Sequence, residues 1–309
     1  MIVAVTGLST GSEIAAGIAV LKALRLSNVE RLIGLAASAF EVGSYQEDLL
    51  DAAYLVPPIQ EQGPFLDRLA QIKAEAGMDA VIPALDNDVR RICAMAAELD
   101  DLGIRALLPG ERVLADLREG RFPATVAGPR KDPEGRLRGS LPALVKSPVQ
   151  SVSGQRNVLE DEFSVCVLAD RRHHATAVAA IKKLLTSKGG STWMALSVDG
   201  GELAEMAAEL VVETGWTGPL TLDFIRNEKG APFLTALHPR FADWINFPAA
   251  ERLNLPGILL DILGGRETAP PQAPPAGRLF VRTAIDIVTD MGRFGTLSLT
   301  GEIRYDDRK

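Results

Sequence analysis

The chain has 309 residues, enough for about two domains of ~150 residues each, and its 47% hydrophobic and 24% charged residues are typical of a globular protein with a sizeable core. Its 33 basic and 40 acidic residues give a net charge of −7, which argues against sequence-blind nucleic-acid binding, because that needs a basic surface. No apolar run reaches the ~18 residues of a membrane span. The start, MIVAVTG, lacks a basic leader, so we expect no secretory signal and a cytoplasmic location.

The chain has two cysteines, Cys93 and Cys166, and both stand in apolar surroundings. Two distant cysteines form neither a disulfide framework nor a zinc site. We therefore expect two buried thiols.

The chain opens with an apolar run at 2–7, a Gly/Ser turn and a helical pattern at 14–25. This order of strand, turn and helix is typical of a Rossmann-like unit. The turn residues Gly7, Ser9, Thr10, Gly11 and Ser12 could present N–H groups to a phosphate at the helix N-terminus. Because the G-x-G-x-x-G spacing is missing, a purely structural turn is the favoured interpretation.

Strand and helix patterns continue to alternate up to residue 110. Strands are expected at 31–38, 52–58, 79–85 and 104–110, and helices at 65–77 and 89–103. Such alternation predicts a parallel sheet covered on both faces.

Three polar residues, Asp86, Asn87 and Asp88, directly follow the expected strand at 79–85. Ligands often bind at the carboxyl ends of such strands. The favoured alternative is that Asp86 or Asp88 caps the next helix.

The composition changes at 119–141, where glycine, proline and charged residues dominate. We therefore divide the chain into a domain at 1–115, a linker at 116–141 and a second domain at 142–309. In the second domain the patterns predict strands at 142–148, 162–170, 278–288 and 297–304, and a strand or helix at 175–185. Helices are predicted at 202–215 and 248–265. A hairpin is predicted from 219–227 and 232–240, and a proline-rich connector at 269–277.

Four stretches together resemble the ATP-grasp superfamily, in particular its carbamoyl-phosphate-synthase-like members. They are DAAYLVPP, DAVIPALDND, EFSVCVLAD and GWTGPLTLDFIRNEKGAPFLTALHPRF, in the running order of that family, and the likeness covers most of the chain. The resemblance implies an α/β plus α+β fold, with a Rossmann-like pre-ATP-grasp domain followed by a reduced ATP-grasp-like domain.

The resemblance also implies a chemistry. ATP-grasp enzymes hold ATP and Mg²⁺ between two subdomains and phosphorylate a carboxylate, which a nucleophile then attacks. By position, the phosphate-binding lysine would be Lys146, and Ser151, Ser153 and Gly154 would belong to the loop that covers the phosphates. Glu162 would be the strand acid, and Lys182 or Lys183 would belong to the basic segment. Asp223 would be the metal ligand, and Arg240 would contact the transferred phosphate. Each of these residues also has a structural interpretation, as a surface residue or a local ion pair.

Two departures from the family pattern affect the metal and adenine sites. The family's second metal-binding glutamate is Ala236 here, and the asparagine of its Asn-Pro-Arg motif is His238, an unusual ligand or acid–base group. Only residues 147–161 separate Lys146 from Glu162, which leaves little room for the usual adenine wall.

We therefore favour a degenerate ATP-grasp-like protein, either a non-catalytic partner or a metabolite-binding member. One alternative is an active, divergent ATP- and Mg²⁺-dependent ligase that works through an acyl phosphate. Another is a dinucleotide-binding oxidoreductase with Glu30 on a ribose. The expected partners are a small-molecule ligand or nucleotide and, among proteins, a second copy of this chain or an active ATP-grasp paralogue, with neither nucleic acid nor membrane.

Overall fold

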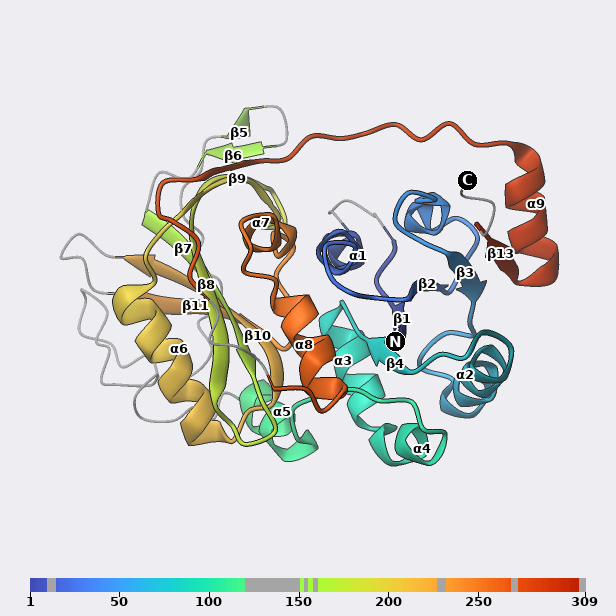
Figure 1. The fold of residues 1–309 in the computed structure, drawn as a ribbon. Helices are drawn as coiled ribbons and strands as arrows, with labels where there is room; N and C mark the ends of the chain where they lie inside the picture. Colours follow the sequence, from blue (N-terminus) through green and yellow to red (C-terminus); the bar gives the residue numbers. More distant parts are fainter. Residues whose placement is uncertain are drawn as a thin grey trace.

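The computed structural model describes residues 1–9, 15–119, 151–152, 155–157, 161–226, 232–267 and 272–305. Two sheets form two lobes, and helices lie between and around them (Figure 1). The residues predicted at 142–148 and most of the predicted linker lie outside the described residues. Among the described helices, none is long and apolar enough to cross a membrane.

The first sheet has five strands in the order β13-β3-β2-β1-β4. They are β1 (Ile2–Val5), β2 (Arg31–Ala36), β3 (Ala52–Leu55), β4 (Ala80–Ile82) and β13 (Glu302–Arg304). Strands β1, β2, β3 and β4 run parallel, as the alternation of strands and helices predicts, and β13 is antiparallel to β3.

Helices of the first lobe connect these strands. They are α1 (Ala16–Leu24), the 3-10 helix η1 (Val42–Tyr45), α2 (Gln62–Ala76), α3 (Asp86–Cys93), α4 (Ala96–Asp101) and α5 (Glu111–Arg118). The single helix predicted at 89–103 is wrong in one respect, because α3 and α4 are separate and break at Ala94–Met95.

The strand predicted at 104–110 is also wrong, because only Arg105 forms a bridge to the first sheet. Beyond Arg105 the backbone turns to the second lobe, where the Thr217 hydroxyl donates to the carbonyl oxygen of Leu108. Gly218 has a φ of +84°, and a Cβ there would overlap the carbonyl oxygen of Leu107. Contact with the second lobe therefore replaces pairing with β4.

The second sheet has eight strands. They are β5 (Ser151–Val152), β6 (Gln155–Asn157), β7 (Asp161–Ala169), β8 (Ala175–Ser187), β9 (Thr192–Ser197), β10 (Gly218–Arg226), β11 (Pro232–His238) and β12 (Leu279–Val281). Their main order is β11-β10-β7-β8-β6-β5, while β9 pairs with β8 and β12. The predicted pairing of the two hairpin strands is confirmed by the antiparallel register of β10 and β11. Residues 175–185 are a strand, and the sequence analysis missed β9.

Helices cover both faces of the second sheet. Helix α6 (Gly201–Thr214) packs on one face, while α7 (Asn246–Ala250) and α8 (Leu255–Leu263) lie between the sheet and α1 (Figure 1). Both free thiols are buried, as expected, and burial raises the pKa of Cys93 and of Cys166 to about 11.

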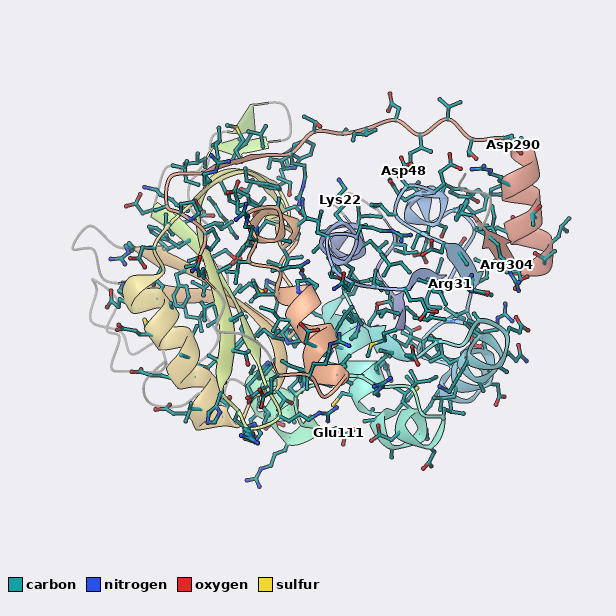
Figure 2. All side chains as sticks on the ribbon, viewed as in Figure 1. Lys22, Arg31, Asp48, Glu111, Asp290 and Arg304 are labelled. Atoms are coloured by element: carbon teal, nitrogen blue, oxygen red, sulfur yellow. The ribbon has the colours of Figure 1, made fainter. Side chains whose placement is uncertain are left out.

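The C-terminal segment returns to the first lobe. After the short strand β12, residues 282–290 run across the molecule to α9 (Met291–Thr300), and β13 then joins the first sheet (Figure 1). Strands predicted over the whole of 278–288 and 297–304 are therefore wrong. Asp290 lies at the start of α9, where its side chain accepts from the backbone N–H of Arg293 at 3.0 Å (Figure 2). The division at 1–115, 116–141 and 142–309 stays a prediction.

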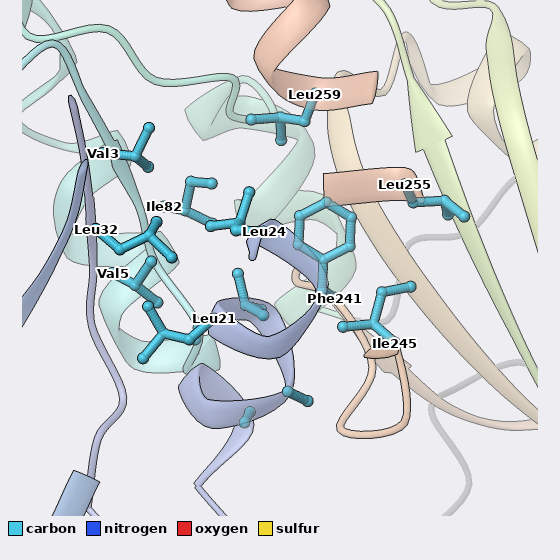
Figure 3. Packing of buried hydrophobic residues seen from close by; sticks show 14 of the residues in the cluster. Val3, Val5, Leu21, Leu24, Leu32, Ile82, Phe241, Ile245, Leu255 and Leu259 are labelled. Atoms are coloured by element: carbon cyan, nitrogen blue, oxygen red, sulfur yellow. The ribbon is translucent and has the colours of Figure 1, made fainter. Parts of the chain in front are cut away.

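One hydrophobic core joins the two lobes. Figure 3 shows residues of this core from β1, β2 and β4, from α1, and from the second lobe: Val3, Val5, Leu32, Ile82, Leu21, Leu24, Phe241, Ile245, Leu255 and Leu259. Because these side chains are buried together, the lobes are held by apolar packing as well as by the polar contacts described below.

Asn254 connects the lobes through two hydrogen bonds. Its side chain accepts from the backbone N–H of Gly257 at 3.0 Å, which caps α8, and donates to the carbonyl oxygen of Ala23 at 2.7 Å, at the end of α1. We expect Asn254→Ala to lower the free energy of unfolding by ~1–2 kcal/mol, measured by urea denaturation. Asp290→Ala, which removes an exposed cap without a contact between lobes, is the control. A loss in Asn254→Ala no larger than in the control would contradict this role.

Candidate functional site

Polar side chains gather on the face of the second sheet that is turned toward α8. In the register of β10 and β11, Asp223 stands opposite Ala236 and Thr221 opposite His238. Because side chains alternate between faces along a strand, Thr221 and Asp223 lie on the side of the buried Cys166, whereas Leu222 and its neighbours pack under α6. The predicted hairpin therefore brings Asp223 and His238 to one face.

Lys183 and Asp223 form a largely buried ion pair on this face. Lys183 Nζ lies 2.7 Å from Asp223 Oδ2, and 7% of the lysine side chain and 20% of the aspartate side chain are exposed. Burial by itself would lower the pKa of Lys183, but the charge of Asp223 and its hydrogen bond outweigh this effect and raise it. Burial would likewise raise the pKa of Asp223, but Lys183 holds it below its usual range. Both groups are therefore charged at neutral pH.

The first lobe contributes Asp86 to the site. Its Oδ2 lies 2.8 Å from His238 Nδ1, and its Oδ1 accepts from Arg240 Nε at 2.6 Å. Burial would raise the pKa of Asp86, but the hydrogen bond from His238 and the charge of Arg240 outweigh burial and lower it. Asp86 is thus an ionised carboxylate that bridges the lobes.

The favoured cap interpretation of Asp86 and Asp88 is wrong. The N-cap position of α3 is Leu85, and no side chain caps this helix. Asp86 instead reaches His238 and Arg240, 152 and 154 residues further along the chain, while Asp88 accepts from the Thr6 hydroxyl at 2.6 Å. The alternative that ligands bind at the carboxyl end of this strand stays a prediction.

His238 is held in one tautomer by Asp86. A carboxylate can only accept, so Nδ1 carries the hydrogen of the 2.8 Å contact. Arg240 is also held by its surroundings, because its Nη1 donates to the carbonyl oxygen of Phe241 at 3.0 Å and its own carbonyl oxygen accepts from the Thr221 hydroxyl at 2.8 Å. Both side chains are therefore held by hydrogen bonds to other parts of the chain.

The structure brings together four of the predicted site residues: Lys183, Asp223, His238 and Arg240. Glu162 lies on β7, and its charge also raises the pKa of Lys183. Of the others, Lys146, Ser153 and Gly154 lie outside the described residues, and Ser151 is described only as backbone of β5. The sequence analysis missed Asp86 as a partner of His238 and Arg240, although its position directly after a buried strand was a signal.

Mg²⁺, which the family resemblance implies, does not fit the described residues. One carboxylate oxygen of Asp223 is taken by Lys183, and the neighbouring position across the strand pair is Ala236, which offers no oxygen ligand. Mg²⁺ needs octahedral oxygen coordination with several waters. Among the described residues, no group of three or more His, Cys, Asp or Glu side chains is arranged to hold a metal.

A buried acid also lies at the end of the first sheet. Asp88 is 8% exposed, and burial raises its pKa despite the opposing hydrogen bond from Thr6. Thr10, Gly11 and Ser12 of the predicted Gly/Ser turn lie outside the described residues, so both interpretations of that turn stay predictions.

We expect Asp88→Asn to raise the free energy of unfolding at pH 7 by about 0.5–1 kcal/mol. A raised pKa means that the folded state favours the protonated acid, so ionised Asp88 costs stability at neutral pH and this cost disappears as the pH falls. An asparagine removes the charge and can still accept from Thr6. Urea denaturation from pH 4 to pH 8 checks this, because the gap between variant and wild type should narrow on acidification. A variant less stable than wild type at pH 7 would contradict it.

A groove of about 580 Å³ lies apart from these charged residues. It runs between α3, α4 and the segment 104–110, with Cys93, Leu99 and Arg171 among its lining residues. None of the residues Asp86, Lys183, Asp223, His238 and Arg240 lines it. The charged residues therefore form a site that is separate from this groove.

No protein-family model and no curated protein matches this sequence. Solved structures match in fold, with a TM-score of 0.54 and 13% identity for an L-amino acid ligase from Bacillus licheniformis, over 85% of this chain and 74% of that chain. A biotin carboxylase from Campylobacter jejuni gives 0.53 and 11%, over 87% and 72%. Pyruvate carboxylase from Rhizobium etli gives 0.55 and 13%, over 88% of this chain but 27% of the other.

These structures are ATP-grasp enzymes, and an identity of 11–13% shows a shared fold. They confirm the family resemblance that the sequence carries, at the level of the fold. The chain has the ATP-grasp fold, built here as a mixed α/β structure with two sheets.

Proposed function

We propose that this chain is a non-catalytic member of the ATP-grasp superfamily that binds a small anionic metabolite or nucleotide without transferring a phosphoryl group. The observation that carries this proposal is that the guanidinium of Arg240 is already hydrogen-bonded to other groups of the chain. Its Nε is bound by Asp86 at 2.6 Å and its Nη1 by the carbonyl oxygen of Phe241 at 3.0 Å. The arginine that would contact the transferred phosphate is thus already neutralised by a carboxylate of the other lobe.

The residues around Arg240 support the same proposal. Phosphoryl transfer is catalysed mainly by positive groups and metal ions that stabilise the charge on the transferring phosphate. Here His238 also donates to Asp86, and Ala236 supplies no carboxylate for a metal. A phosphate arriving at Arg240 would compete with Asp86 for the charge of the guanidinium, whereas a ligand bound nearby would not.

The carboxylase and ligase neighbours suggest the class of ligand. One of them, the biotin carboxylase, was solved in complex with an ATP analogue. Nucleotide binding in this chain, a Rossmann-like character of its first lobe, and a protein partner, either a second copy or an active ATP-grasp paralogue, are parts of the proposal. The groove at α3 and α4 offers a second concave surface where a small ligand could bind.

The decisive experiment measures phosphate release from ATP by the purified chain, with Mg²⁺ and a mixture of carboxylic acids and amino acids. We expect no release above a control without protein. Melting temperatures with ATP, ADP and a metabolite set should identify at least one ligand that stabilises the folded state, because binding to the folded state alone raises stability.

Two variants make this experiment specific. Arg240→Lys changes the candidate site, whereas Arg171→Lys changes an arginine of the separate groove. Phosphate release by the wild type that disappears in Arg240→Lys but persists in Arg171→Lys would overturn the proposal and establish an active ligase instead.

A further inference from the structure

We infer that the ammonium group of Lys183 is a built-in cation that takes the place of a divalent metal ion at Asp223. This inference rests on the proposed function, because a site that transfers no phosphoryl group has no need of a removable metal. Three observations carry it: how Lys183 reaches Asp223, which charges surround the pair, and how the second oxygen of Asp223 is enclosed.

The register of three neighbouring strands brings the two residues together. Phe163 of β7 pairs with Lys182 of β8, which places Glu162 beside Lys183, and Ser164 of β7 stands opposite Asp223 of β10. Lys183 and Asp223 are therefore separated by one whole strand, and the lysine side chain lies across β7 to reach Asp223 Oδ2 at 2.7 Å. Because the long side chain is buried along the sheet, its ammonium group lies beside the carboxylate of Asp223.

The cations already present around Asp223 disfavour a second cation. The carboxylates that raise the pKa of Lys183 are those of Asp223, Asp243 and Glu162. Asp243 is already paired with Arg282, whose Nη1 lies 3.1 Å from Asp243 Oδ2. A divalent ion at Asp223 would therefore stand beside the ammonium of Lys183 in a buried place, where repulsion between like charges is strong.

The enclosure of Asp223 also excludes a hydrated ion. Its second oxygen, Oδ1, is buried from solvent, and a hydrogen bond from Ser164 also helps to lower the pKa of Asp223. Mg²⁺ keeps several of its waters when it binds a protein, so while the ammonium of Lys183 occupies the position at Oδ2, the enclosed Oδ1 offers a hydrated ion no second place to bind. An ammonium group needs no such shell, so Lys183 fits where the metal does not.

Mn²⁺ is the probe for this inference, because its electron paramagnetic resonance signal reports free ion directly, without nucleotide and without activity. We expect wild-type protein to leave the Mn²⁺ signal unchanged. In Lys183→Met the carboxylate of Asp223 loses its cation, so Mn²⁺ should bind at least ~tenfold more tightly than to wild type and should raise the melting temperature of the variant.

The neighbouring lysine gives a matched control. Lys182 lies on the opposite face of β8 and pairs with Asp161, so Lys182→Met should behave like wild type toward Mn²⁺. Lys183→Met/Asp223→Asn, which removes both charges, should lose the Mn²⁺ binding gained by Lys183→Met. If Lys183→Met does not fold, Lys183→Gln, which keeps a hydrogen-bond donor without the charge, is measured in the same way.

Two results would overturn the inference. One is a Mn²⁺ site in the wild type that disappears in Asp223→Asn. The other is a lysine variant, Lys183→Met or Lys183→Gln, that binds Mn²⁺ no more tightly than wild type. These results are separable from failure of the proposed function, because ATP turnover without Mn²⁺ binding at Asp223 overturns that function alone, and Mn²⁺ binding without turnover overturns this inference alone.

Discussion

Replacement of Lys183 by methionine is expected to lower the free energy of unfolding by ~3–5 kcal/mol. Methionine fills much of the volume of the lysine stem, so the loss comes from the charge and not from a cavity. Asp223 would be left as a carboxylate without the ammonium of Lys183, in a place where its Oδ1 is buried from solvent. Urea denaturation at pH 7, with circular dichroism as the readout, measures the loss.

The pH dependence of this loss follows from the two pKa shifts. The raised pKa of Lys183 means that its contribution is present at neutral pH and disappears as the pH rises above ~10.4, through the folded-state pKa. The lowered pKa of Asp223 means that its contribution disappears as the pH falls below ~3.9. Without Lys183, burial should raise the pKa of Asp223 in the variant, so the loss in Lys183→Met should be nearly constant from neutral pH up to ~10 and should shrink on acidification.

A double replacement separates the charge from the packing. In Lys183→Met/Asp223→Leu both charges are gone, and apolar residues often replace a buried ion pair at little cost. We expect the double variant to be more stable than Lys183→Met alone. Lys182→Met, which removes a partly exposed ion pair with Asp161, should cost less than ~1 kcal/mol. A double variant no more stable than Lys183→Met would show that the pair is not the source of the loss.

The hairpin of the candidate site was predictable because its two strands are close together in the sequence. The run PLTLDFIRN alternates between faces, and it is followed closely by PFLTALH, so pairing and register follow from a short connection. This pairing places Asp223 and His238 on one face by geometry alone. The position of Lys183 was predictable only through the family resemblance, since its partner lies one strand away and 40 residues further along the chain.

The contact of Asp86 with His238 and Arg240 was not predictable from the same patterns. It joins residues more than 150 positions apart in two lobes. The hydrophobic pattern of one segment carries no information about which residues of the other segment it contacts. A helix-capping preference is a local tendency, and tertiary contacts override it. The sequence shows that a polar side chain follows β4, but which residues this side chain contacts depends on how the two lobes pack against each other.

The errors at the C-terminal end have a different cause. The β-branched and leucine residues of 297–304 favour a strand by composition, yet Asp290 caps a helix at 291 and Gly301, with a φ of +74°, ends it. The following three residues then pair with β3, a strand almost 250 positions earlier. A strand whose partner is so distant in sequence cannot be assigned to a sheet by its position along the chain.

Two groups of polar contacts between the lobes lie at the start of β10 and the end of β11. Asp86 meets the end of β11, and the backbone near Leu107 and Leu108 meets Thr217 and Gly218 at the start of β10. In an enzyme that clamps a nucleotide between its parts, such contacts would form and break during the cycle. Here an apolar core shared by both lobes accompanies them, which favours a fixed arrangement and agrees with a binding function.

Asp86→Ala is expected to lower the free energy of unfolding at pH 7 by ~2–3 kcal/mol, less than a fully buried pair because 40% of the Asp86 side chain is exposed. Arg240 and His238 would both lose their carboxylate, and Arg240 is only 19% exposed. Urea denaturation measures the loss. Asp79→Ala is the control, since Asp79 pairs with Arg105 at 3.7 Å at the other end of β4 and within the first lobe.

The pH dependence distinguishes lost charge from lost packing at Asp86. Because the folded-state pKa of Asp86 is lowered, its contribution is present above the unfolded value of ~3.9 and disappears as the pH falls through the folded value. The stability gap between wild type and Asp86→Ala should therefore narrow on acidification below pH ~4. Asp86→Asn, which keeps the shape and an acceptor for Arg240, should lose less than Asp86→Ala at pH 7. A gap that stays constant into acid would assign the effect to packing, and the bridge between the lobes would then not depend on the charge of Asp86.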